Sequence, residues 1–271
     1  MKKQIKIVIS ALVVVLMLVS FYGCQTADTG DFPMPTSKIS GHEANITPNV
    51  DFDIIKTEIK EVEKLDIPKD KGSCDSFNFE SLDEMFSLCG YAVYGKVISA
   101  SEINCKDTYK NGDANSFYSS LIELEVIKNL GGQELVNKEN NIIRIAYAYC
   151  SYEYYKGIPE LEQGDECIMF LSDTSKIKAY TSQDYYEYAP YYMVFPYEYI
   201  IEKYDDGFNA YTLMSFANGK KIINNMGEER IAKCYSLAEI EEVISANKDK
   251  LIGLTYEEFI NSFLKRERDS D

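Results

Sequence analysis

The chain has 271 residues and a formal net charge of −16, with 44 acidic residues against 28 lysines and arginines. This acidity excludes nucleic-acid binding by neutralisation of phosphates, and it opposes adsorption to anionic lipid head groups. The length suits one folded domain with short additions.

The first residues have the pattern of a secretory signal. A basic head, residues 1–6, precedes an apolar stretch, residues 7–22, that carries no charge. This order is typical of a signal peptide, and the stretch is shorter than the roughly twenty residues of a membrane span. It stops at Gly23 and Cys24.

A small residue directly before a cysteine, at the end of an apolar run, resembles the lipobox of bacterial lipoproteins. In that family the cysteine is acylated and becomes the new N-terminus. The resemblance implies that residues 1–23 are removed and that lipid on Cys24 holds the protein on the extracytoplasmic face of the cell membrane. The alternative is an uncleaved anchor helix with an incidental cysteine.

Residues 24–50 are predicted to be a flexible tether, because small and polar residues dominate and large apolar residues are nearly absent. A tether directly after Cys24 favours the lipid anchor over the uncleaved helix. Each buried methylene of an acyl chain contributes about 0.8 kcal/mol, so two or three chains anchor stably. Apart from this covalent lipid, we expect no cofactor.

Residues 51–235 are predicted to form one mainly β domain, although residues 51–65 are ambiguous, because apolar residues at helical spacing lie in a charged segment. A helix is expected after Ser81, because Ser81 and Glu84 form the capping-box pattern and Gly90 ends the apolar stripe. Alternating apolar residues and turn signals then predict strands at residues 91–98, 117–128, 142–149, 166–171, 191–204, 208–216 and 220–223.

The strand at residues 166–171 is apolar on both faces and is predicted to be central. Residues 236–271 are predicted to be a helical segment, since capping boxes begin at Ser236 and Thr255. One helix, about seven hairpin-like strands and two C-terminal helices, without βαβ alternation, predict an α+β, mainly β fold that is an antiparallel barrel or sandwich.

The middle of the chain resembles uncharacterised exported bacterial proteins that contain an OB-like barrel. The resemblance covers residues 81–215 and rests on four segments: residues 92–97, 117–128, 142–146 and 161–171. Netrin and tissue-inhibitor-of-metalloproteinase modules are similar in strand order. The resemblance implies an OB-like barrel. It does not imply inhibition, because those inhibitors use a free N-terminal cysteine, whereas Cys24 would be acylated.

Six cysteines besides Cys24 permit disulfides in an exported protein. Their spacing contains no CxxC motif and defines no pairing. Cys89 and Cys167 lie in apolar runs and are predicted to be buried as small hydrophobic residues. The six are Cys74, Cys89, Cys105, Cys150, Cys167 and Cys234.

The only histidine, His42, lies in the predicted tether. Ser-His-Asp, Cys-His and histidine-rich zinc sites need an imidazole held in place, so these mechanisms are excluded. A carboxylate-dependent hydrolase of extracellular or wall polysaccharide remains the alternative function. Its acids would come from residues that the sequence does not rank, among them Glu102, Glu123, Glu125, Glu166 and Glu187.

Residues 111–116 place oxygen ligands at alternate positions, as a calcium loop does. The sixth position is Ser116 rather than glycine, and the twelfth is Ile122 rather than glutamate. We therefore interpret the segment as a solvated loop and predict no metal site.

Tyrosine is the positive signal for binding, because fifteen of the 22 tyrosines lie between Tyr147 and Tyr211. Tyrosine also favours strands, but two clusters are predicted in loops, where exposed rings supply contact area for a protein, peptide or glycan. The sequence thus predicts a membrane-anchored, non-catalytic binding module. Its candidate residues are Tyr152, Tyr154, Tyr155, Tyr185, Tyr186, Tyr188, Tyr191 and Tyr192.

Overall fold

The computed structural model describes one unit of the chain, Ala44–Asp271, in part. The described residues are 53–65, 79, 81–135, 138, 140–147, 150–151, 159–193, 199–220, 234–255, 257–258 and 261. The signal, Cys24, the tether, His42 and Cys74 lie outside them. The described part is mainly β, as predicted, and is built on one eight-stranded sheet.

The strand order in the sheet is β1-β2-β3-β4-β6-β5-β7-β8, and β2 also pairs with β5. The pairings β2–β3, β3–β4, β4–β6, β6–β5 and β5–β2 therefore form a closed path of five strands. The strands are β1 Ile54–Val62, β2 Tyr91–Tyr109, β3 Ala114–Gly132, β4 Ile142–Tyr147, β5 Glu166–Asp173, β6 Tyr191–Tyr192, β7 Ile200–Tyr204 and β8 Gly207–Phe208.

Two strand pairings test the predicted fold. The β4–β6 pair is parallel, so the prediction of a purely antiparallel sheet is wrong. β5 pairs with β2 on one side and with β6 and β7 on the other, which confirms that this apolar strand is central. Each strand of the closed path contributes to one buried cluster, which includes Val93, Leu124, Ile145, Met169 and Tyr191.

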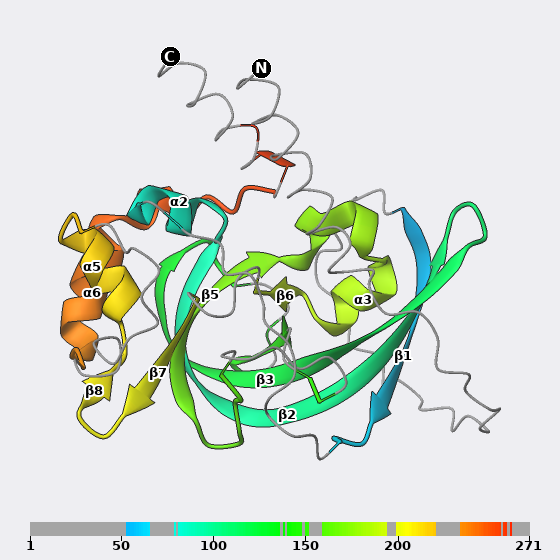
Figure 1. Cartoon of the computed structure of the whole chain (residues 1–271), viewed down its shortest axis with the longest axis horizontal. Coiled ribbons are helices and arrows are strands. Elements are labelled where there is room, and N and C mark those ends of the chain that lie inside the picture. The colour runs from blue at the N-terminus through cyan, green and yellow to red at the C-terminus, as the bar shows by residue number, and fades with distance from the viewer. Residues whose placement is uncertain are drawn as a thin grey trace, which may run out of the picture. The chain divides into compact units, whose positions relative to one another are not determined.

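Three helices cover the outer face of β2, β5 and β7: α2 Leu82–Ser87, α5 Tyr211–Ala217 and α6 Leu237–Ala246 (Figure 1). They share a second buried cluster with the strands, which includes Phe86, Phe170, Phe208, Leu213 and Ile240. The described part also contains the 3-10 helices η1 Thr174–Tyr180 and η3 Lys248–Lys250.

α3, Gln183–Tyr188, lies over the curved β1–β2–β3 part of the sheet (Figure 1). A third buried cluster fills this contact. It contains Ile103 and Cys105 of β2, Leu121 of β3, and Tyr185 of α3.

Several sequence predictions are confirmed. Ser81 caps α2 and accepts from the backbone N–H of Glu84. Ser236 and Glu239 form the capping box of α6. The register of β2 with β3 shifts between Tyr94 and Gly95, as is common where a glycine interrupts a strand. Cys89 and Cys167 are fully buried, which raises the pKa of both thiols.

The second C-terminal capping box is also present. The Thr255 hydroxyl accepts from the backbone N–H of Glu258 at 3.1 Å, and the Glu258 carboxylate accepts from the backbone N–H of Thr255 at 2.8 Å. Residues 257, 258 and 261 are helical, and the remaining residues of this predicted helix lie outside the described part.

The predicted strand at residues 208–216 is wrong. The turn at residues 205–206 is present, but β8 stops at Phe208 and residues 211–217 form α5. Leu213, Met214, Ser215 and Phe216 are all buried. In a short segment that is buried on all sides, the spacing of apolar residues does not distinguish a helix from a strand. The helix therefore follows from tertiary packing.

Other strand boundaries also differ from prediction. The ambiguous residues 51–65 contain a strand, β1, and β2 extends eleven residues beyond the predicted end at residue 98. The predicted strand at residues 191–204 is two strands, β6 and β7. Residues 148–149, 194–198 and 221–223 of the predicted strands lie outside the described residues.

Candidate functional site

The described candidate tyrosines lie in regular elements rather than in a loop. Tyr185, Tyr186 and Tyr188 are on α3, and Tyr191 and Tyr192 form β6. The prediction of a loop is therefore wrong for Tyr185, Tyr186 and Tyr188, whereas Tyr191 and Tyr192 lie in a strand, as predicted for residues 191–204. Ser182 caps α3 and Asp184 follows in its first turn, a helix-start signal that was available in the sequence. Tyr152, Tyr154 and Tyr155 lie outside the described residues.

Three of these tyrosines are core residues. Tyr185, Tyr186 and Tyr191 are 6%, 3% and 0% exposed. Tyr191 packs edge-on against Tyr91 with ring centroids 5.1 Å apart, and burial raises the pKa of Tyr185. Rings held this way supply packing to the fold instead of contact area to a partner.

Tyr188 and Tyr192 are half-buried. The guanidinium of Arg144 lies 5.6 Å from the centre of the Tyr188 ring, a cation–π geometry. Burial raises the pKa of both phenols. Tyr188 and Tyr192 are thus the two residues among the five described candidates that stay partly exposed.

Ser151 and α3 lie on opposite faces of β2. Ile103 points to the cluster under α3. The neighbouring Glu102 accepts from the backbone N–H of Ser151 at 2.7 Å, and Ser151 directly precedes residues 152–158. Successive strand side chains point to opposite faces, so Ser151 is held on the face away from α3.

The five candidate glutamates are occupied separately. The partners are Ser151 for Glu102, Arg144 and Ser99 for Glu123, Lys203 and Tyr94 for Glu166, and Gln183 for Glu187, while Glu125 stands opposite Lys96 in the register. The Lys203 hydrogen bond lowers the pKa of Glu166. A catalytic acid needs the opposite shift. Glu166 therefore does not fit the role of the acid in the alternative hydrolase.

Residues 111–116 belong to the β2–β3 hairpin. The amide of Asn111 donates to the Asp113 carboxylate at 2.7 Å, and its carbonyl accepts from the Asp113 backbone at 2.9 Å. β3 begins at Ala114, so Asn115 and Ser116 are strand residues. No group of three or more histidine, cysteine, aspartate or glutamate side chains suited to a metal occurs among the described residues.

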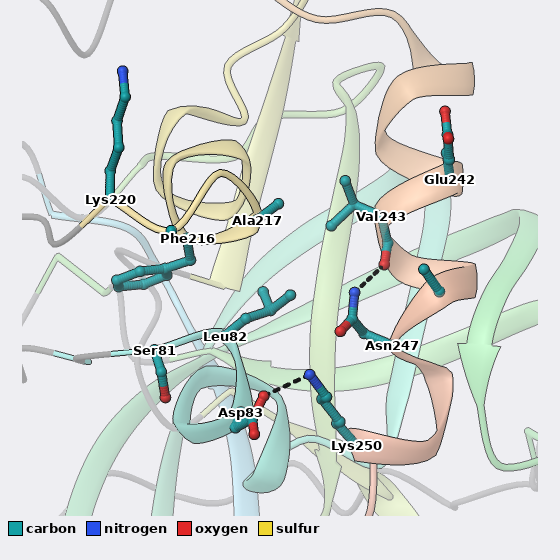
Figure 2. A pocket seen from close by; sticks show the side chains of 12 residues that line it. Ser81, Leu82, Asp83, Phe216, Ala217, Lys220, Glu242, Val243, Asn247 and Lys250 are labelled. Carbon is teal, nitrogen blue, oxygen red and sulfur yellow. Dashed lines mark hydrogen bonds and ion pairs between the residues drawn. The ribbon is translucent and has the colours of Figure 1, made fainter.

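A hollow of about 470 Å³ lies between α2, α5 and α6, within the size range of ligand pockets. Figure 2 shows Leu82 of α2, Ala217 of α5 and Val243 of α6 grouped at its centre. Leu82 and Val243 lie in apolar stripes that the sequence predicts. The sequence does not show that the two stripes face each other, because α5 was expected as a strand.

The rim of the hollow carries both signs of charge. Asp83 of α2 and Lys250 of η3 form an ion pair at 2.6 Å across one end (Figure 2). Lys220 and Glu242 also line the rim. The Asn247 amide donates to the Val243 carbonyl at 2.8 Å, which holds the end of α6. The hollow therefore combines an aliphatic floor with a mixed-charge rim.

None of the helices in the described part of the chain is long and apolar enough to cross a bilayer. Comparison of the chain with protein-family models, with curated proteins and with solved structures found no match.

Proposed function

We propose that the protein is an extracytoplasmic lipoprotein, anchored to the cell membrane by lipid on Cys24, and that its domain is a non-catalytic binding module. The anchor is supported by the basic head, the uncharged apolar stretch, the Gly23–Cys24 junction and the polar residues 24–50. Because the chain is strongly acidic, lipid supplies an attachment that a basic patch does not.

The hollow between α2, α5 and α6 is the observation that carries the binding proposal. Its aliphatic floor suits one or two apolar side chains, and its rim suits charges of either sign. These features favour a peptide or protein segment over a glycan, since sugars are bound on exposed aromatic rings. Tyr204, 45% exposed, is the most exposed aromatic residue in the described part. Tyr152, Tyr154 and Tyr155 stay candidates for a second contact surface.

We also propose that the five-stranded closed path is an OB-like barrel, as the sequence resemblance implies. The support is that all five strands contribute to one buried cluster and that an OB fold is a five-stranded, partly open barrel. An experimental structure tests this. Loss of either the β2–β5 or the β4–β6 pairing there would rule out a barrel.

The anchor is tested by feeding cells an alkyne-tagged fatty acid. The wild-type protein is expected to take up the label and to fractionate with membranes. Cys24→Ala is expected to lose the label and to be misprocessed or released. Cys89→Ala, which removes a buried thiol, is the control and keeps the label. Persistent labelling of Cys24→Ala would refute the anchor.

The binding site is tested with a displayed peptide library panned against the full-length protein in detergent micelles. Ala246 and Ala238 are both exposed on α6, but only Ala246 lines the hollow. Ala246→Gln is expected to weaken enriched peptides at least tenfold, while Ala238→Gln binds like wild type. Equal binding by both variants, or no enrichment, would contradict the proposed site without affecting the lipid anchor.

A further inference from the structure

A chain of buried hydroxyl groups joins β1, β2 and α3. The Thr57 hydroxyl of β1 donates to the Asp107 carboxylate of β2 at 2.7 Å and lies 2.6 Å from the hydroxyl of Ser182, the N-cap of α3. The Ser182 oxygen accepts from the backbone N–H of Tyr185 at 3.1 Å. All three side chains are at least nine-tenths buried.

The direction of each hydrogen bond follows from the ionised form of Asp107. A carboxylate only accepts, so Thr57 directs its single proton to Asp107. Ser182 must then donate to Thr57. The three elements are thus joined by one continuous chain of donors that ends on the carboxylate.

The carboxylate at the end of this chain has no cationic partner among the described residues. The other titratable groups that face it are the Cys105 thiol on its own strand and the Tyr185 phenol of α3. The Asp184 carboxylate of α3 accepts instead from the backbone N–H of Thr57 at 3.3 Å, and the exposed Lys56 interacts with Asp184.

We propose that the junction of α3 with β1 and β2 is an acid-tightened latch, in which uptake of one proton by Asp107 strengthens the packing of α3 on the sheet. Burying an ionised carboxylate without a cation is unfavourable, whereas the neutral carboxyl keeps its hydrogen bond from Thr57 at no such cost. When α3 lifts, Asp107 becomes hydrated, so the proton favours the closed state.

The pKa of Asp107 supports this direction. Burial raises it from 3.8 to about 6, and the hydrogen bond from Thr57 partly opposes the shift. A carboxyl with a raised pKa in the closed state stabilises that state at low pH, and the gain is lost as the pH rises through the raised value. From these two pKa values, closure is expected to weaken about tenfold between pH 5 and pH 7.5.

Hydrogen exchange of the full-length protein in detergent micelles tests the latch. The protection of α3 amides, corrected for intrinsic exchange, is expected to fall about tenfold from pH 5 to pH 7.5 in the wild type. Asp107→Asn is expected to show no such fall. Glu202→Gln, which removes a half-buried carboxyl from β7, is the control and leaves the α3 profile unchanged.

A second variant separates titration from loss of structure. Thr57→Val removes the hydrogen bond that lowers the Asp107 pKa, so the pH dependence should persist with its midpoint moved to higher pH. Wild-type protection that runs parallel to Asp107→Asn at every pH would overturn the proposal. An unmoved or lowered midpoint in Thr57→Val would overturn it as well, even if Asp107→Asn fails to fold.

Discussion

At the residue scale, a comparison of two glycines distinguishes the cost of a positive φ from the cost of a steric clash. Gly112 and Gly132 both have a φ of +89°, in the region that favours glycine. A Cβ at Gly132 would lie 2.1 Å from the carbonyl oxygen of Gly90, whereas a Cβ at Gly112 would meet nothing within 4 Å. Gly132 ends β3 where the chain passes directly beside the turn between α2 and β2.

Gly132→Ala is therefore expected to destabilise the protein more than Gly112→Ala. The shared cost of a positive φ is about 1 kcal/mol, and only Gly132→Ala must also move backbone atoms. Chemical unfolding should show a loss of about 1 kcal/mol for Gly112→Ala and at least twice that for Gly132→Ala. Equal losses of unfolding free energy in the two variants would mean that the backbone at Gly90 moves aside without a measurable cost.

At the element scale, α6 depends on the capping box that the sequence predicts. The Ser236 hydroxyl accepts from the backbone N–H of Glu239 at 3.3 Å, and the Glu239 carboxylate accepts from the backbone N–H of Ser236 at 2.8 Å. α6 buries Ile240 and Ile244 in the second buried cluster, which α2, α5 and α6 share with the sheet. It also forms one side of the hollow. The cap therefore positions the proposed binding site.

Ser236→Ala should lower the free energy of unfolding by about 1 kcal/mol, because a helix N–H loses its acceptor. Ser236→Asp keeps an acceptor and should stay near the wild-type value. Both are measured by urea unfolding followed by circular dichroism. A loss in Ser236→Asp equal to that in Ser236→Ala would show that the cap does not stabilise α6.

At the scale of the whole molecule, two carboxyls with raised pKa values, on the buried Asp107 and the half-buried Glu202, make stability depend on pH in an unusual direction. Burial raises the pKa of Asp107 to about 6 and also raises that of Glu202. The carboxyls with lowered pKa values, Glu58, Glu166 and Glu258, are near the surface, where ion pairs contribute little. The raised groups should therefore dominate between pH 5 and pH 7.5.

The free energy of unfolding is expected to rise as the pH falls from 7.5 to 5. A group with a raised folded pKa stabilises the fold at low pH and loses that contribution as the pH rises through it, which gives about 1 kcal/mol for Asp107. Chemical unfolding at several pH values measures the rise, and Asp107→Asn with Glu202→Gln should remove most of it. Glu58→Gln should retain it. A wild-type protein that loses stability towards pH 5 would contradict the prediction.

Features that depend on residues close together in the chain could be predicted from the sequence, whereas features that depend on distant residues could not. Ser81 and Ser236 were recognisable as caps because a capping box lies within four residues. β5 was recognisable as central because it is apolar on both faces. α3 was predicted as a loop, because tyrosine is a weak helix former. The helix is held by the Ser182 cap and by the packing of Tyr185 onto Ile103 and Cys105 of a distant strand.

By itself, the sequence determined the mainly β class, the caps, the buried thiols and the signal and cysteine pattern of the proposed anchor, because each depends on neighbouring residues. Only the tertiary structure decided the closed path of strands, the hollow between three helices and the burial of the candidate tyrosines. Each of these depends on pairing between residues far apart in the chain, such as Tyr91 with Leu171. Periodicity says that a residue is buried, but not which distant residue covers it.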